Sequence, residues 1–318
     1  MNKNKRTDIA IYVALNEEFQ YILKSFDCDF NPVELEDIAI TYFEGSVFSE
    51  ELGSDVEIAL IPSGRMGNSR SSTIMSAMLN ILKPQNIVVL GIAGSLDNDL
   101  NPGDVLIPDS IIEYFANSAA VEDKGKDKSI EDKEDKSSND KWRLDLSGNS
   151  FISSPRLINR FQNFRYTKPV FYSNFLTMQA NNKGQLITNE IIKKLQENEV
   201  EIDLEGKLFT GDDKILASGP TVGKDKSFVK WLKSKNRKIT AIEMESAGVY
   251  EAVLARTYPL RVMALRGISD FADERKEKIE GSAKTVFRIL AIKNCVSLLT
   301  CAIKGGLFEE EKKTIIQR

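Results

Sequence analysis

The chain has 318 residues, 42% of them hydrophobic, a formal net charge of −4 and a pI of about 5.3. This length and apolar content suit a globular protein with a sizeable core, and the acidic balance excludes binding driven by attraction to nucleic-acid phosphates. The chain contains no histidine, which excludes Ser-His and Cys-His nucleophiles and histidine metal sites and leaves acid–base chemistry to Asp, Glu, Lys, Tyr or Cys.

The first third of the chain alternates predicted strands and helices. Apolar runs predict strands, and apolar residues three or four apart predict helices. In chain order we expect a strand at 8–15, a helix from Phe19, strands at 38–43 and 56–62, a helix that ends at Leu82, and strands at 86–90 and 105–108. Two glycine-containing segments, 64–67 and 91–94, adjoin these elements.

Residues 121–141 interrupt this alternation. Lysines alternate there with Asp and Glu, and Ile130 is the only large apolar residue between 123 and 141. Such a segment buries too little apolar surface to fold alone, so it predicts a disordered or solvated insertion. A lid or a partner contact is the alternative.

The second half of the chain returns to alternating elements. Helices are expected at 154–164 and 188–198, with no assignment for 170–178, followed by a strand at 215–218, a helix at 228–234, a strand at 239–242, a helix at 246–255, a strand at 261–265 and a helix at 283–304. The pattern predicts an α/β fold with a largely parallel or mixed sheet covered on both faces.

No targeting or membrane segment is expected. The first residues run directly into a strand without the hydrophobic region of a signal peptide, and no apolar segment is expected to reach the roughly 18 residues of a membrane span. The three cysteines, Cys28, Cys295 and Cys301, have no CxxC spacing, so neither a zinc site nor a disulfide framework is predicted. We therefore expect a cytoplasmic protein.

Asp270 is the first residue with a chemical interpretation. It follows the apolar run 262–265 and precedes Phe271. A carboxyl group in a partly dry pocket has a raised pKa, keeps its proton near neutrality and can act as a general acid. The alternative is a helix cap, because Ser269 and Asp270 are both good capping residues; local sequence alone favours capping.

Other carboxylates also follow predicted strands. Glu243 and Glu245 are two residues apart, so strand alternation places them on one face, where they suit the vicinal hydroxyls of ribose; acidic residues at a helix start are the alternative. Glu18 suits activation of water or a solvent-facing first helical turn. The segment 64–67 suits an anion cradle or a structural turn.

Together these segments resemble the nucleoside phosphorylase/nucleosidase superfamily, especially its methylthioadenosine/S-adenosylhomocysteine nucleosidase branch. Seven ordered segments carry the resemblance: 14–18, 63–68, 91–94, 103–105, 217–219, 243–246 and 266–270. It implies one catalytic domain over 8–305, with a central mixed sheet, a distorted barrel and flanking helices. It also implies hydrolysis of the N-glycosidic bond of a purine nucleoside or nucleotide. Adenine is the favoured base.

The resemblance also implies roles for individual residues. Asp270 protonates purine N7, Glu245 binds the ribose hydroxyls, Glu18 activates the attacking water, and Arg266 helps to hold that water. The remaining substrate contacts that it implies are Met244 and Glu243 beside the sugar, Val222 at the base, and Ser218, Arg65, Ile92, Ala93 and Gly94 around them. Val222 replaces the usual aromatic residue, and Ile92 stands where the nucleosidases carry serine.

Three alternatives remain open at this point. A phosphorylase needs cations for phosphate, and Arg65 and Arg70 are available, but Glu17 and Glu18 would repel phosphate, so hydrolysis is favoured. The segments 217–220, 244–248 and 266–273 also resemble nucleosidase-type effector domains of immune sensors, which can act on nucleotides, including ATP. The third alternative is a non-catalytic nucleoside-sensing module.

The expected partners are few. The resemblance implies a small-molecule purine substrate and a homodimer or larger homo-oligomer. No metal or redox cofactor is expected, because side chains supply the acid, the sugar clamp and the base for water. Nucleic acid and membranes are not expected partners.

Overall fold

The computed structural model describes residues 7–35, 38–116, 119–122, 142–145, 148–211, 214–221 and 226–309. A twelve-stranded mixed sheet forms its centre. Its strands are β1 (Ile9–Val13), β2 (Asn31–Leu35), β3 (Ile38–Ser49), β4 (Ser54–Pro62), β5 (Asn86–Ser95), β6 (Val105–Ile107), β7 (Ser110–Glu113), β10 (Asn149–Ile152), β11 (Leu208–Thr210), β12 (Ile215–Ser218), β13 (Ile239–Glu243) and β14 (Arg261–Phe271). The strands β8 (Ala119–Glu122) and β9 (Trp142–Asp145) pair separately.

The main sheet has the order β10-β7-β12-β13-β5-β1-β4-β3-β2, and β14, β6 and β11 branch from it. β1 runs parallel to β4 and β5, β14 runs parallel to β5, and β13 runs antiparallel to β5. The predicted mixed sheet is confirmed. Among the described strands, however, the sheet ends at β2 and β10 and does not close into a barrel.

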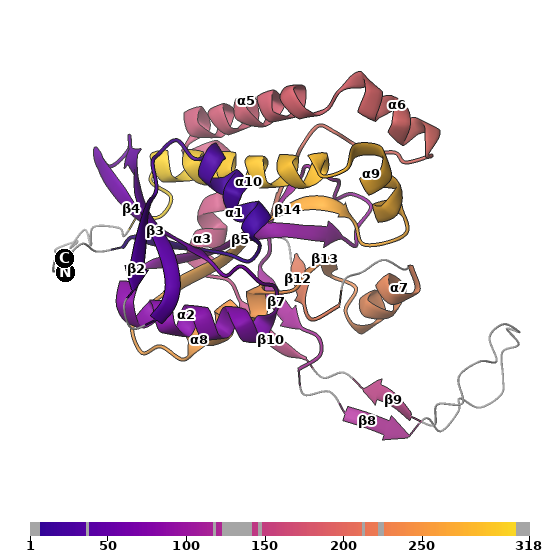
Figure 1. Ribbon diagram of the computed structural model, residues 1–318, viewed down its shortest axis with the longest axis horizontal. Helices are drawn as coiled ribbons and strands as arrows, with labels where there is room; N and C mark the ends of the chain where they lie inside the picture. Colours follow the sequence, from indigo (N-terminus) through magenta and orange to yellow (C-terminus); the bar gives the residue numbers. More distant parts are fainter. Residues whose placement is uncertain are drawn as a thin grey trace, which may run out of the picture.

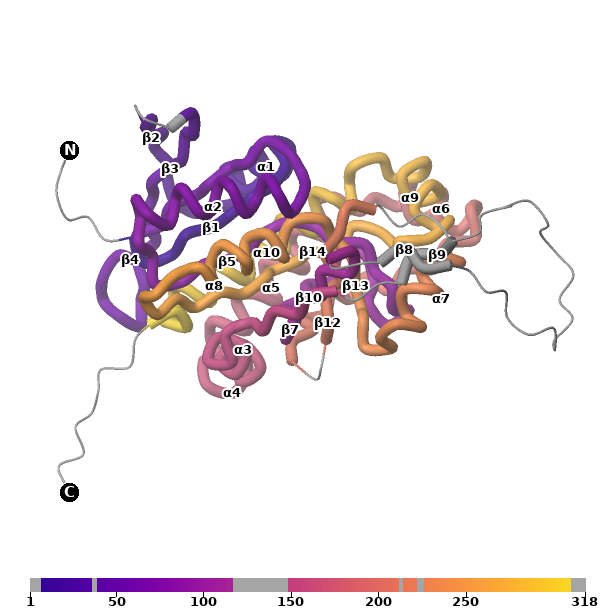
Figure 2. Tube along the Cα trace, turned by 90° about the horizontal axis from the view of Figure 1, so that it is seen from below, coloured from indigo at the N-terminus to yellow at the C-terminus, as the bar shows by residue number. Residues whose placement is uncertain are grey.

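Helices cover both faces of this sheet (Figure 1). They are α1 (Asn16–Ser25), α2 (Asn68–Leu82), α3 (Pro155–Gln162), α4 (Phe164–Thr167), α5 (Pro169–Leu186), α6 (Asn189–Glu197), α7 (Lys226–Lys235), α8 (Ser246–Leu254), α9 (Arg275–Ala283) and α10 (Val286–Lys304). α1, α5 and α10 lie on one face, and α2 and α8 run side by side on the other (Figure 2).

The side chains of strand β1 show why helices cover both faces of the sheet. Its five residues are all fully buried, and successive side chains point to opposite faces. Ile9, Ile11 and Val13 belong to the apolar cluster that contains α10 residues, whereas Ala10 and Tyr12 belong to the cluster that contains α2 and α8 residues. A continuous apolar strand of this kind is typical of a sheet buried on both sides.

Helix α10 corrects the expectation that no segment is long and apolar enough to span a membrane. Within the described residues it alone passes that test of length and composition. Its apolar window is 78% buried inside the protein, where it packs against α5 and β14. This burial is that of a core helix.

Strands β5 and β14 extend further than the sequence predicts. The expected strands end at 90 and 265, whereas β5 continues to Ser95 and β14 to Phe271. The two strands pair in parallel from Asn86↔Arg261 to Ser95↔Phe271, with a register shift after Ile268. The residues 91–94 and 266–270, expected in loops and turns, therefore lie within strands.

Two other segments differ from the predicted secondary structure, and a third lies mostly outside the described residues. The stretch 170–178, left unassigned from sequence, belongs to α5, and α9 has no predicted counterpart. Of the expected insertion 121–141, Val121 and Glu122 belong to β8, and residues 123–141 lie outside the described residues.

Candidate active site

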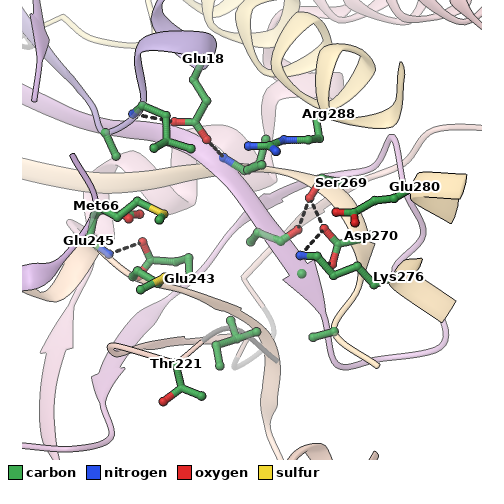
Figure 3. A pocket seen from close by; sticks show the side chains of 18 residues that line it. Glu18, Met66, Thr221, Glu243, Glu245, Ser269, Asp270, Lys276, Glu280 and Arg288 are labelled. Atoms are coloured by element: carbon green, nitrogen blue, oxygen red, sulfur yellow. Dashed lines mark hydrogen bonds and ion pairs between the residues drawn. The ribbon is translucent and has the colours of Figure 1, made fainter. Parts of the chain in front are cut away.

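A cavity of about 270 Å³ opens at the carboxyl ends of β1, β5, β13 and β14. Helices α1, α9 and α10 also contribute to its wall, together with Met66 before α2 and Thr221 after β12. Ligands bind at this edge of open α/β sheets because the loops and helix starts there present polar groups. Figure 3 shows Glu18, Glu245 and Asp270 on three sides of the cavity.

Glu18 enters the cavity from the first turn of α1. Its carboxylate accepts hydrogen bonds from the backbone N–H groups of Leu15 and Ile92, both at 3.3 Å. Only 5% of the residue is exposed, so it is not the solvent-facing glutamate of the alternative interpretation. Burial raises its pKa, and the positive charge of Arg266 opposes that rise.

Arg266 lies behind the cavity wall. It is 1% exposed and donates hydrogen bonds to Glu243 and, at 2.9 Å, to Ser246 Oγ. A Cβ atom at Gly91 would collide with the Arg266 guanidinium, which explains the glycine at this point of β5. Because Arg266 does not line the cavity, it acts on the site through the carboxylates that it contacts.

Glu243 and Glu245 have different surroundings although both line the cavity. β13 ends at Glu243, and its carboxylate accepts the backbone N–H groups of Glu245 and Ser246 at 2.9 and 3.0 Å. Glu243 therefore stabilises the start of α8, as the alternative interpretation proposed. Glu245 is the N-cap residue, makes no capping hydrogen bond with its side chain and is 5% exposed. Met244, between them, also lines the cavity because the chain leaves the strand here.

The electrostatics of Glu245 follow from this position. Burial, and then the negative charge of Glu243, raise its pKa, while Arg266 at 3.8 Å from its carboxylate opposes the rise. An ionised Glu245 thus destabilises the folded state. Stability therefore does not explain a glutamate at this position.

This gives a prediction for stability. The unfolded-state pKa of a glutamate is about 4.3, and the folded-state pKa of Glu245 lies above it. The contribution of Glu245 to the stability of the wild-type protein therefore falls as the pH rises between these two values. Glu245→Gln lacks this group, so its melting temperature should equal that of the wild type near pH 4 and exceed it increasingly towards neutrality. Thermal unfolding of both proteins across this pH range measures the difference between their melting temperatures. A difference that does not vary with pH contradicts a raised pKa of Glu245.

Asp270 is the penultimate residue of β14 and is 6% exposed. Ser269 Oγ donates to its carboxylate at 2.6 Å, and Lys276 Nζ lies 3.1 and 3.2 Å from its two oxygens. Burial raises the pKa of Asp270, and Lys276 opposes that rise. Ser269 and Asp270 cap no helix, because both lie within β14 and the N-cap residue of α9 is Glu274. The carboxylate that bonds the start of α9 is that of Asp273, which accepts the backbone N–H of Arg275 at 2.9 Å.

The structure separates the other predicted residues into two groups. Ile92, Ala93 and Gly94 line the cavity, whereas Ser218 and Arg65 do not. Ser218 is buried and joins α2 to α8: its hydroxyl donates to Asn68 Oδ1 at 3.0 Å and accepts the backbone N–H of Ala247 at 3.2 Å. Arg65 is exposed.

The predicted contact of Val222 with the base lies outside the described residues. Its neighbour Thr221 is described and lines the cavity.

Several cavity residues were missed from sequence. Lys276 and Glu280 lie four residues apart on α9, Arg288 lies in the first turn of α10, and Met66 precedes α2. Lys276 and Glu280 share a helix face, as residues four apart do, but α9 has too few apolar residues to be recognised as a helix. No local signal identified them.

The charges around the cavity are unequal. Among the described residues, five carboxyl groups line it, those of Glu18, Glu243, Glu245, Asp270 and Glu280, against two cations, Lys276 and Arg288. Lys276 contacts Asp270, and Arg288 contacts Glu17 at 3.3 Å. Such a site can protonate a leaving group, accept hydrogen bonds from hydroxyls and take a proton from water, and it is poorly suited to an anion.

Comparison with known proteins gives a consistent result. The family model described as "Phosphorylase superfamily" matches residues 8–304. The ATP nucleosidase Cap17 of Escherichia coli (strain KTE188) is 24% identical over 212 residues, which are 66% of this chain and 35% of that protein. This chain thus spans about a third of the length of that relative.

Two further comparisons cover nearly the whole chain. The aminodeoxyfutalosine nucleosidase of Helicobacter pylori (strain J99) is 24% identical over 287 residues, 89% of this chain and 96% of that protein. Among solved structures, the 5′-methylthioadenosine/S-adenosylhomocysteine nucleosidase of Neisseria meningitidis, in complex with methylthio-immucillin-A, aligns with a TM-score of 0.57 at 15% identity, covering 94% of this chain and 99% of that one. At this identity the structural match establishes a shared fold.

Proposed function

Because the chain belongs to the phosphorylase superfamily, we propose that it hydrolyses the N-glycosidic bond of an adenine nucleoside or nucleotide and releases the free base. The observation that carries this proposal is the convergence of Asp270, Glu245 and Glu18 on one cavity at the carboxyl end of the sheet. The similarity to an aminodeoxyfutalosine nucleosidase, which aligns with 89% of this chain, supports the same class of reaction.

In the proposed reaction the three carboxyl groups have separate tasks. Asp270, protonated because burial raises its pKa, gives its proton to N7 of the purine as the bond between C1′ and N9 breaks. The base leaves as a neutral molecule with the electron pair of that bond. Glu245 accepts hydrogen bonds from the ribose hydroxyls and stabilises the positive charge that develops on the sugar. Glu18, in its ionised form, takes a proton from the water that attacks C1′.

The charge of the cavity supports hydrolysis rather than phosphorolysis. The two arginines considered for phosphate, Arg65 and Arg70, are exposed and do not line the cavity. Of the residues that the structure describes, the two cations that line it, Lys276 and Arg288, already contact carboxylates. The ionised carboxylates of the cavity would repel a phosphate ion, whereas they would not repel a neutral water molecule.

A second candidate is a nucleotide nucleosidase that acts as an effector in immune defence. The similarity to an ATP nucleosidase supports it. Among the substrates of the first candidate, the carboxylates that line the cavity make an uncharged nucleoside a better fit than a nucleotide.

The test is an assay of base release. The protein is incubated with methylthioadenosine, adenosine, inosine and ATP, with and without phosphate, and the free base is quantified. We expect adenine release that needs no phosphate. Release that requires phosphate would identify a phosphorylase, ATP as the preferred substrate would favour the effector, and binding without release would identify a nucleoside sensor.

We further propose that residues 8–305 act as one catalytic domain, that the protein works in the cytoplasm and that it forms a homodimer or larger homo-oligomer. The family match over residues 8–304 supports the first of these. The resemblance to the nucleosidases supports the other two.

A further inference from the structure

Lys276 makes a close ion pair with the proposed acid. Its Nζ lies 3.1 Å from one oxygen of Asp270 and 3.2 Å from the other. The lysine side chain is 18% exposed and the aspartate side chain 8%, so the pair is largely removed from water. Both residues line the cavity, and Figure 3 shows the lysine reaching across to the carboxylate from α9.

The chain between the two residues is folded to produce this contact. Asp273 accepts the backbone N–H of Arg275 at 2.9 Å, and the Arg275 guanidinium returns hydrogen bonds to both oxygens of Asp273. The same guanidinium stacks on the ring of Phe271, 3.7 Å from its centre. These contacts fix the sharp turn from β14 into α9, so that Lys276, in the first turn of the helix, lies over Asp270.

Building on the function proposed above, we infer that Lys276 is a positioning residue that makes Asp270 a stronger acid by holding the carboxylate left when the proton departs. In the reaction the O–H bond of Asp270 breaks and the N7–H bond of the purine forms. A neutral carboxyl group thus becomes an anion in a site with little water. The Lys276 ammonium and the Ser269 hydroxyl are the groups that stabilise that anion.

The other charges near Asp270 cannot replace Lys276. Glu280 on the same helix is negative and raises the pKa of Asp270 further. Across the cavity Glu18, Glu243 and Glu245 are acidic, Arg288 contacts Glu17, and Arg266 contacts Glu243. Within the described part of the chain, Lys276 is the cation in contact with Asp270.

The first test compares Lys276→Met, Lys276→Arg and Lys278→Met. Lys278 is an exposed lysine on the same helix, so its variant removes an equal charge without touching Asp270. An opposite charge at this distance shifts a carboxyl pKa by about 1 to 3 units. We expect Lys276→Met to lower kcat by about 10- to 100-fold and to move the basic limb of the pH profile of kcat/KM upward by about 1 to 3 units.

The sign of that shift follows from the role of Asp270. The basic limb reports loss of its proton, and without the lysine the proton is held to higher pH. Lys276→Arg should keep the limb within a few tenths of its wild-type position, and Lys278→Met should leave both kcat and the limb unchanged. A Lys276→Met protein that is slow but has an unmoved basic limb would overturn the inference, since lost stability alone produces that result.

A second measurement does not depend on turnover. The carboxyl carbon of Asp270 is titrated by NMR in ¹³C-aspartate-labelled protein without substrate, and its signal is assigned by its absence in Asp270→Asn. The titration midpoint should rise in Lys276→Met and stay in place in Lys278→Met. If this shift occurs but no nucleoside is hydrolysed, the proposed function fails and the ion pair's effect on Asp270 stands. An unmoved midpoint overturns the inference whatever the activity.

Discussion

Asp270→Asn should lower the rate of base release by about 10²- to 10⁴-fold, the range of general acid catalysis. The amide has no acidic proton to give to N7, so the purine must leave as an anion. Substrate binding should change little, because asparagine keeps the size and most of the hydrogen-bonding capacity of the aspartate. The effect therefore falls on kcat, and steady-state kinetics with the best nucleoside measures it.

The fold of this variant should be intact. Burial raises the pKa of Asp270, so the neutral side chain suits its site at least as well as the carboxylate. Its melting temperature should be close to that of the wild type. Asp99→Asn, at an exposed position, is the matched control and should retain full activity. An Asp270→Asn protein that releases base at the wild-type rate would eliminate Asp270 as the acid.

The sequence alone could not decide between an acid and a helix cap at Asp270. The structure excludes capping by Asp270, which lies within β14 and lines the cavity, whereas Asp273 bonds the start of α9. The decision depends on where β14 ends, and that is set by its pairing with β5 along the whole of both strands. Pairing between segments 175 residues apart leaves no trace in a local pattern.

The two glutamates near position 244 show the same limit. Strand alternation predicted that they act together, yet β13 ends at Glu243, which bonds the start of α8 while Glu245 keeps its side chain for the cavity. What the sequence did predict well was the buried strands and the fold class, because continuous apolar runs specify strands covered on both faces. The sequence could not predict the role of Lys276, because its contact with Asp270 exists only after the chain turns at Asp273.

The candidate active site contains carboxyl groups whose burial disfavours their charged form. Glu18 and Glu245 both have raised pKa values because they are buried, and the negative charge of Glu243 raises the pKa of Glu245 further. Arg266 relieves part of this cost from behind the wall. A cluster of this kind weakens the folded state, which argues that the carboxylates serve the chemistry of the cavity and not its stability.

Glu18→Gln should be as damaging as loss of the acid, with a fall in kcat of about 10²- to 10⁴-fold. Glutamine fills the same space, and its amide oxygen can still accept from one of the two N–H groups that Glu18 binds, but it cannot take a proton from water. Glu17→Gln is the matched control. That neighbouring carboxylate contacts Arg288 and is 38% exposed, so its variant should retain most of the activity.

The pH profile and an added nucleophile identify the role of Glu18. Its ionised form is required, and its pKa is raised, so wild-type activity should increase with pH through that value and Glu18→Gln should lose this acidic limb. Azide attacks C1′ without giving up a proton, and the variant no longer has the Glu18 carboxylate that would repel this anion. Azide should therefore accelerate base release by Glu18→Gln and form a ribosyl azide. The same addition should not restore Asp270→Asn, whose defect is in the leaving group. If azide has no effect on Glu18→Gln while the acidic limb persists, another group activates the water.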